Sequence, residues 1–281
     1  ELELDGAWAR RIGEEGRGVR TIMEMVNHTR LDCVIGSAAL MRRAVVQAIH
    51  HARQRKAFGR FLIEQPLMQN VLADLALESE AATALMLRLA RAYDASSPTA
   101  SGSGQHEAFM RRIATACAKY WICKRAPALA AEALECLGGN GYVETFPLAR
   151  LYRDAPLNSI WEGPGNVIAL DVLRALDREP HTLGAVLSEI EAAAPGEARL
   201  ARHVEALKAE LHAGDTEYRA RRHAERLALG LQASLLLQHA PSFVSDAFCA
   251  TRLGGDGGHA FGTLPAGTRA AAIIERAFPP G

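Results

Sequence analysis

One segment of the chain, residues 137–173, carries most of the residue types that could do chemistry: LGGNGYVETFPLARLYRDAPLNSIWEGPGNVIALDVL. It opens with the glycines Gly138, Gly139 and Gly141. Glycine backbone can approach another group closely, and successive N–H groups in such a loop can face a phosphate. A helix cap followed by a tight turn would use the same glycines, so both interpretations stay open on composition alone. No strand pattern precedes the segment, which argues against a dinucleotide-binding fingerprint.

One carboxylate of this segment, Glu162, stands between Trp161 and Gly163 and just before Pro164. We expect a helix to begin near the proline. The helix dipole favours a carboxylate at that end, and burial beside an aromatic ring disfavours the charged form. A carboxylate under both influences suits a general base. An acidic residue that only starts a helix would occupy the same position, so this alternative remains.

Other candidate groups lack the spacing of a site. The ten histidines show no HExxH pattern, and His50 and His51 are adjacent rather than one helical turn apart, so we expect no metal. The five cysteines form no CxxC pair, which indicates reduced thiols in the core of a cytosolic protein. The stretch GGDGGHAFG has no strand before it and no Lys-Ser/Thr after it, so we interpret it as a flexible connector.

Helical periodicity dominates the first two thirds of the chain. A proline, Pro127, is expected to kink the third helical segment or to start a new helix. The small, polar residues 94–105 indicate a mobile connector. Long helices with short connections predict an all-α fold, an antiparallel four-helix bundle. The segments with apolar residues at intervals of three and four are 21–53, 65–93, 105–137 and 164–176.

The composition changes at about residues 178–182, and a smaller helical appendix is expected beyond that point. The chain as a whole has 32 basic and 32 acidic residues and is 49% hydrophobic. This balance argues against disorder and against a globally basic nucleic-acid binder. No apolar run is long enough for a membrane span, and the polar start predicts no signal peptide. The helical segments of the appendix are residues 183–213, 216–239 and 241–251, followed by a last short stretch.

Three motifs together resemble the acyl-CoA dehydrogenase family. The first is the order LGG-x-GY, P-x-x-R-x-x-RDA and I-x-EG in residues 137–163. The second is R-x-x-FG at residues 55–59, and the third is Asn-His-Thr-Arg at residues 27–30. The resemblance covers residues 12–176. It implies three parts: the end of a middle β-domain with its linker at 1–19, the C-terminal helical bundle at 20–178, and an extension at 179–281.

The resemblance also implies roles for particular residues. Glu162 corresponds to the base that removes the α-proton of an acyl-CoA while the β-hydride passes to FAD. Thr29 stands where some branches carry that base, and it cannot serve. The substrate-binding residues implied are Arg30, near the thioester, and Asn27. The FAD contacts implied, several of them from a neighbouring subunit of a homotetramer, are Arg55, Phe58, Gly138, Gly139, Gly141 and Asn166.

Departures from the usual family pattern indicate a branch. Glu135 and Pro66 stand where many members have glutamine, and Asn27 replaces a common aspartate. These departures and the extra helical region after residue 176 are similar to the AidB-like alkylation-response branch. In that branch the extension is implicated in DNA binding.

A DNA-associated protein with weak dehydrogenase activity is therefore the alternative function, and a structural oligomerisation domain is a third. The candidate DNA contacts are Arg219, Arg222 and Arg226, which should share a helix face. A solvated helix face is the more ordinary interpretation, because residues 180–281 contain ten Lys and Arg against eleven Asp and Glu.

Overall fold

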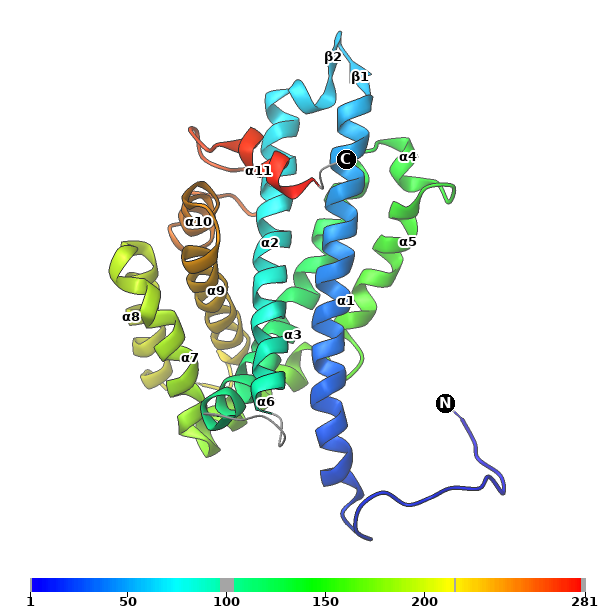
Figure 1. Cartoon of the computed structure of the whole chain (residues 1–281), viewed down its shortest axis with the longest axis vertical. Helices are drawn as coiled ribbons and strands as arrows, with labels where there is room; N and C mark the ends of the chain where they lie inside the picture. Colours follow the sequence, from blue (N-terminus) through cyan, green and yellow to red (C-terminus); the bar gives the residue numbers. More distant parts are fainter. Residues whose placement is uncertain (1, 97–103, 215, 279–281) are drawn as a thin grey trace.

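The computed structural model describes residues 2–96, 104–214 and 216–278. Four helices form the bundle expected from the sequence, and in Figure 1 the first three run alongside one another with alternating direction. The fourth helix packs against the third. The all-α prediction is confirmed. The bundle helices are α1 (Gly18–Gln54), α2 (Pro66–Ala95), α3 (Gly104–Glu135) and α6 (Gly165–Arg178).

Two connections within the bundle are structured. A small hairpin of β1 (Lys56–Ala57) and β2 (Arg60–Phe61), followed by the 3-10 turn η1 (Leu62–Glu64), joins α1 to α2. The connection from α3 to α6 contains the short helices α4 (Gly139–Tyr142) and α5 (Pro147–Asp154) and the 3-10 turn η2 (Ala155–Ser159). The sequence pattern did not predict α4 and α5, because each is too short to show a periodicity.

The appendix packs on the bundle and shares its core. Helices α7 and α9 contact α3, and α11 contacts α2. Buried side chains of the appendix, such as Leu231 and Phe248, belong to the same apolar cluster as Leu75 and Ile113 of the bundle. The elements of the appendix are α7 (Pro180–Ala193), η3 (Ala194–Gly196), α8 (Ala198–His212), α9 (Ala220–His239), α10 (Ser242–Phe248), η4 (Cys249–Leu253) and α11 (Ala270–Ala277).

Several local expectations can be compared with this structure. Helix α3 continues through Pro127, so no new helix begins there. The segment 183–213 is divided between α7 and α8 by η3, which contains Pro195 and Gly196. Most of the connector expected at 94–105, residues 97–103, lies outside the described residues. Residues 2–17 are exposed and contain neither helix nor strand, and the domain assignment of this segment stays a prediction.

The five cysteines lie in the core, as the sequence predicted. All five cysteines are buried and free. In the part of the chain that the structure describes, no helix is long and apolar enough to cross a membrane. No group of three or more His, Cys, Asp or Glu side chains is arranged for a metal within the same residues.

A buried ionic cluster ties the appendix to the bundle. Arg252, in the π turn η4, lies 2.6 Å from Asp74 and 3.0 Å from Glu78 of α2. Arg125 of α3 lies 3.1 Å from Glu78. Burial raises the pKa of Glu78, but the two guanidinium groups outweigh it and hold the pKa below its ordinary value. Asp74 also accepts a hydrogen bond from the Gly262 backbone, which fixes one end of the glycine-rich loop.

We predict that Arg252→Met destabilises the chain by about 3–5 kcal/mol, because it leaves two buried carboxylates short of a partner. Since the folded-state pKa of Glu78 is depressed, its stabilising contribution is present at neutral pH and is lost as the pH falls through that value. The difference in free energy of unfolding between wild type and variant should therefore become smaller at acidic pH. Urea unfolding at neutral and acidic pH measures both effects.

The matched control is Arg276→Met, which removes the partner of Glu80 on the surface between α11 and α2. A more exposed pair of this kind contributes about 0–1 kcal/mol. Equal losses for the two variants would contradict the importance of the buried cluster.

Candidate functional site

The turn that carries Glu162 has an unusual backbone. It lies between η2 and α6, and Glu162 has a φ of 57° while Gly163 has a φ of 113°. Among the described residues, the non-glycine residues with positive φ are Glu162 and Phe58, and both were site candidates from the sequence. A left-handed conformation of a residue with a long side chain is uncommon and persists where surrounding contacts enforce it.

Two cations from different helices hold this turn. Arg30 of α1 donates from Nε to the Glu162 carbonyl oxygen at 3.1 Å. Lys119 of α3 donates from Nζ to the carbonyl oxygens of Trp161 at 2.8 Å and Gly163 at 2.6 Å. Three successive carbonyl groups of the turn are thus each bound by a buried cation.

Arg30 is itself fixed by an ion pair. The Arg30 residue is 5% exposed, and its Nη1 lies 2.7 Å from Asp171 Oδ2 on α6. Arg112 of α3 pairs with the other oxygen of Asp171 at 3.2 Å. Arg174 approaches the same carboxylate at 3.6 Å from the solvent side. The expected neighbour of the base is therefore beside Glu162, but it contacts the backbone of that residue.

The Glu162 side chain is only partly covered. The residue is half-buried, and within the described residues its carboxylate accepts no hydrogen bond. Burial lowers the pKa of Lys119, and the charge of Arg30 adds to this, while Cys123, Cys33 and Glu162 act in the opposite direction. The Glu162 carboxylate is thus within electrostatic reach of the Lys119 ammonium, without a hydrogen-bond donor among the described residues.

Asn27 and Thr29, which precede Arg30 on α1, make no hydrogen bond to the Glu162 turn among the described residues. The Asn27 carbonyl oxygen accepts a hydrogen bond from the Tyr93 hydroxyl at 2.8 Å, and its side chain remains partly accessible. The Thr29 hydroxyl donates to the Val26 carbonyl oxygen within α1 at 3.0 Å. The Thr29 hydroxyl is therefore used inside the helix.

The appendix reaches the site through Asn166. The Asn166 side-chain oxygen, in the first turn of α6, accepts a hydrogen bond from Arg221 of α9 at 2.8 Å. The sequence analysis did not select Arg221, Asp171 or Lys119. Lys119 gave a usable signal, since it lies three residues after Ala116 and four before Cys123 on the apolar face of its helix. A lysine on such a face is rarely buried without a specific role.

A second group of predicted residues lies on the hairpin and α4. Phe58 (φ 53°) and Gly59 (φ 80°) form the turn between β1 and β2, the pattern of a type I′ hairpin. The Phe58 ring is 99% exposed, and Arg55 at the end of α1 is exposed as well. Both would be open to a ligand or a partner.

The three glycines differ in their surroundings. Gly138 has a φ of 58°, and no atom would lie within 4 Å of a Cβ there or at Gly139. A Cβ on Gly141 would lie 2.0 Å from the Leu134 carbonyl oxygen. Gly141 is therefore needed for packing, which was one of the two interpretations of the sequence, whereas the backbone of Gly138 and Gly139 is accessible.

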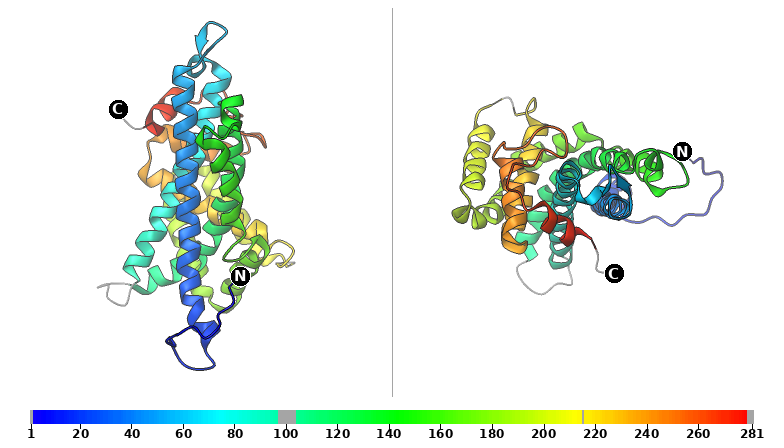
Figure 2. Two further views of the ribbon diagram at one scale, coloured as in Figure 1. Left: turned by 90° about the vertical axis from the view of Figure 1, so that its right-hand side faces the viewer. Right: turned by 90° about the horizontal axis from the view of Figure 1, so that it is seen from above.

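The two groups of residues lie far apart. Arg30 and Arg55 are 25 residues apart on α1, which corresponds to about 37 Å along the helix axis. Figure 2 shows α1 running along most of the molecule, with the hairpin at one end. Within one chain, Glu162 and Phe58 therefore cannot contact the same part of a ligand.

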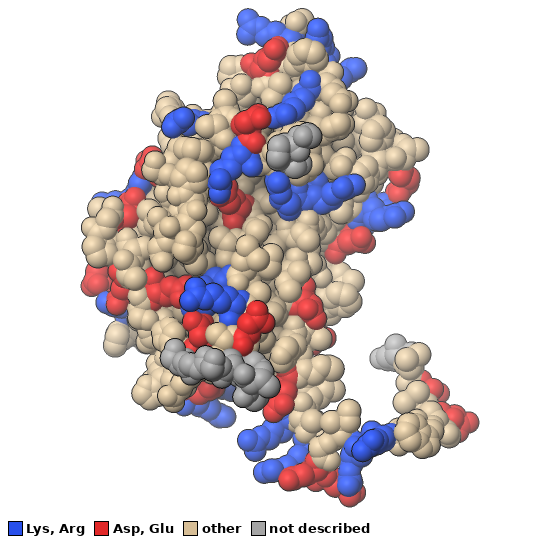
Figure 3. Space-filling view, viewed as in Figure 1, with Lys and Arg blue, Asp and Glu red and all other residues tan. Residues whose placement is uncertain are grey.

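Two of the three arginines predicted to contact DNA form ion pairs with a glutamate of the same chain. Arg222 and Arg226 both pair with Glu210 of α8, at 2.9 Å and 3.3 Å. Arg219 precedes the first residue of α9 as its N-cap, so it lies at the end of the predicted helix face. On the face shown in Figure 3, acidic and basic side chains are interspersed rather than segregated.

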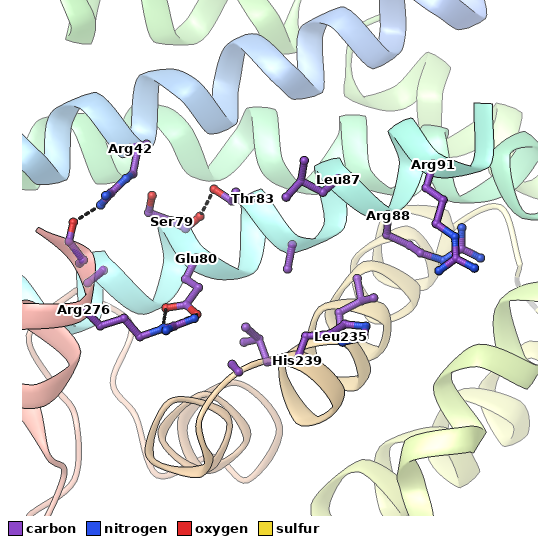
Figure 4. A pocket seen from close by; sticks show the side chains of 15 residues that line it. Arg42, Ser79, Glu80, Thr83, Leu87, Arg88, Arg91, Leu235, His239 and Arg276 are labelled. Atoms are coloured by element: carbon purple, nitrogen blue, oxygen red, sulfur yellow. Dashed lines mark hydrogen bonds and ion pairs between the residues drawn. The ribbon is translucent and has the colours of Figure 1, made fainter. Parts of the chain in front are cut away.

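A separate cavity of about 580 Å³ lies between α2, α9 and α11. Figure 4 shows Leu87 and Leu235 along its middle, Arg42 and Arg276 toward one end and Arg88 and Arg91 toward the other. None of the residues selected from the sequence lines it. The cavity belongs to the junction of bundle and appendix rather than to the Glu162 site.

Comparison with known proteins decides the family. Residues 16–176 match the family described as "Acyl-CoA dehydrogenase, C-terminal domain". The chain belongs to the acyl-CoA dehydrogenase family. All the predicted site residues except Arg219, Arg222 and Arg226 fall within the matched range.

Among curated members of the acyl-CoA dehydrogenase family, the chain is 50% identical over 179 residues to "Putative acyl-CoA dehydrogenase AidB" of Escherichia coli K12. This match covers 64% of the chain and 32% of the relative. The chain thus spans about a third of the length of this relative. The resemblance to an AidB-like branch is confirmed by this similarity.

Solved structures show that the appendix is shared by some relatives. The structure of Caenorhabditis elegans ACDH-11 in complex with C11-CoA has a TM-score of 0.80 and 30% identity, covering 89% of this chain and 47% of that one. An acyl-CoA dehydrogenase from Geobacillus kaustophilus matches 59% of this chain and 40% of its own, with a TM-score of 0.51 and 30% identity. A match over 89% of the chain must include much of the appendix, which lies beyond the matched family domain.

We predict that Arg30→Met destabilises the chain by about 2–3 kcal/mol, because it removes a buried ion pair and the donor to the Glu162 carbonyl while Arg112 still partners Asp171. Arg174→Met is the matched control on the same carboxylate and should cost no more than about 1 kcal/mol, since its side chain is largely exposed. Chemical unfolding of both variants tests this. Similar losses of stability in the two variants would show that the buried contacts of Arg30 add no more than the exposed pair of Arg174.

Proposed function

We propose that this chain is the C-terminal catalytic part of an FAD-dependent acyl-CoA dehydrogenase, in which Glu162 removes the α-proton of the acyl group. The observation that carries the proposal is the Glu162 turn itself. Its backbone is held in a left-handed conformation by Arg30 and Lys119, and its carboxylate is left without a hydrogen bond among the described residues. A base held by its backbone and free at its carboxylate suits proton abstraction.

The remaining residues are assigned by what they contact. FAD, when bound, would accept the β-hydride. Because Arg30 is buried and bound to Asp171 and to the Glu162 carbonyl, we propose that it orients the base and does not contact the thioester directly. Asn27 lies three residues before Arg30 on α1 and is partly accessible. It is therefore the better candidate for contact with the acyl-CoA.

The separation of the two groups supports an oligomer. Glu162 and Asn166 would face one flavin, beside Arg30. Arg55, which lies about 37 Å from Arg30 along α1, would contact the flavin of another subunit together with Phe58 and Gly138. We propose a homotetramer built in this way. Large apolar side chains exposed near these groups support covered interfaces: Phe58, Tyr142, Val143, Ile160 and Trp161.

Such side chains would also contact the rest of the longer relatives' chain. This chain spans about a third of the length of its E. coli relative, and the other two thirds of such a chain offer a second cover for this surface. A cytoplasmic location remains part of the proposal.

The main prediction is that Glu162→Gln abolishes flavin reduction by acyl-CoA while FAD stays bound. The amide preserves size and hydrogen bonding but is too weak a base, and loss of a general base costs about 10² to 10⁴ in rate. The protein for this test joins the N-terminal region of the E. coli relative to residues 16–281. Stopped-flow bleaching of the flavin absorbance measures the rate. This chain alone should show no turnover.

The control is Glu144→Gln, a change of the same kind at an exposed acid paired with Arg153 in the connection before α5. It should leave flavin reduction unaffected. An unchanged rate in Glu162→Gln would show that another group is the base.

The DNA-associated alternative gains no support from the charges. Two of the three arginines on the predicted DNA face, Arg222 and Arg226, are already paired with Glu210. We predict that this chain binds duplex DNA weakly, with an affinity that falls steeply as salt is raised. Fluorescence anisotropy at two salt concentrations measures this. Tight binding that survives high salt and is lost in Arg219→Ala would restore these arginines as a DNA site.

A further inference from the structure

A buried lysine, Lys119, contacts the backbone of the Glu162 turn. Lys119 is 1% exposed and lies in the middle of α3. In the described residues its hydrogen bonds go to the carbonyl oxygens of Trp161 and Gly163, and no carboxylate pairs with it. A buried ammonium without an ion-pair partner is rare in folded proteins. An apolar side chain of similar length would fill the same space, so packing alone does not explain the lysine.

The two bonds of Lys119 bracket Glu162. They bind the carbonyl groups immediately before and after that residue, while Arg30 binds the carbonyl between them. Three carbonyl oxygens that converge on two neighbouring cations define the path of the backbone from Trp161 to Gly163. This path includes the left-handed φ of Glu162, a conformation that other contacts must enforce.

We infer that Lys119 is a positioning residue for Glu162: its ammonium clamps both sides of the turn and so sets where the carboxylate lies. The catalytic consequence rests on the proposed function, whereas the clamp itself does not. Without the clamp, the strained backbone relaxes to an ordinary conformation and the carboxylate moves. Misplacement of a catalytic group by about 1 Å is enough to lower a rate about 10²-fold.

Two substitutions separate this role from simple packing. Lys119→Met fills the space but removes the donors. Lys119→Gln removes the charge but keeps an amide with two N–H donors. The control is Lys124→Met, on the same helix, whose ammonium lies over the Tyr120 ring and makes no hydrogen bond to the turn among the described residues.

The first measurement uses this chain by itself. The NMR ¹³Cα and ¹Hα shifts of Glu162 and Gly163 report whether their backbone is left-handed. We expect wild type, Lys124→Met and most of the Lys119→Gln population to keep the signature, and Lys119→Met to lose it. A left-handed Glu162 in Lys119→Met would overturn the inference. If Lys119→Met does not fold, Lys119→Leu, which also lacks donors but has a shorter side chain, is compared with Lys119→Gln in its place, and a left-handed Glu162 in Lys119→Leu would overturn the inference.

The second measurement uses the flavoprotein that joins the N-terminal region of the E. coli relative to residues 16–281. In Lys119→Met the limiting rate of flavin reduction should fall about 10²-fold with the acyl-CoA dissociation constant changed less than threefold, and Lys119→Gln should recover most of the rate. A purely structural lysine would lower stability and leave the limiting rate of the folded enzyme unchanged. If the wild type itself is not reduced by acyl-CoA, the proposed function fails, and the NMR result still decides the clamp.

Discussion

The arrangement of the site depends on one constraint: two cations buried between α1, α3 and α6 must bind the backbone of a single turn. Arg30 and Lys119 are separated from each other in sequence by almost ninety residues of helix and connection, and they meet only because the bundle places α1 against α3. Asp171 completes the arrangement from α6 by neutralising Arg30. The long helices thus act as a rigid frame, and the frame stabilises a backbone conformation that a free loop would leave.

The same helix that carries Arg30 separates the two functional ends. Its 37 residues separate the start of α6, which the Glu162 turn precedes, from the β1–β2 hairpin at the other end of the molecule (Figure 1). Each end exposes apolar side chains and accessible backbone. A long straight helix therefore explains why a single chain offers two half-sites, and why assembly of several chains would be needed to bring complementary halves together.

The appendix extends this frame rather than forming an independent unit. Its apolar side chains join the core of the bundle, and the buried cluster around Arg252 links it to α2 and α3. Through Arg221 it also contacts Asn166 at the start of α6. Arg221, Arg222 and Arg226 of α9 therefore bind groups of the same chain, namely Asn166 and Glu210.

The sequence by itself determined the helical fold, because apolar periodicity over thirty residues has no other structural interpretation, and it singled out Glu162, Arg30 and Phe58 through ordered motifs. It placed the ends of α1, α2 and α6 within a few residues. Only the tertiary structure decided how Glu162 is held and which cations are free. Lys119 and Asp171 become partners of the site through contacts between helices, and Arg222 and Arg226 are paired with Glu210 across two helices. The apolar periodicity of a segment determines which face of its helix is buried. It does not determine which charged side chains form ion pairs, because these depend on how the helices pack together.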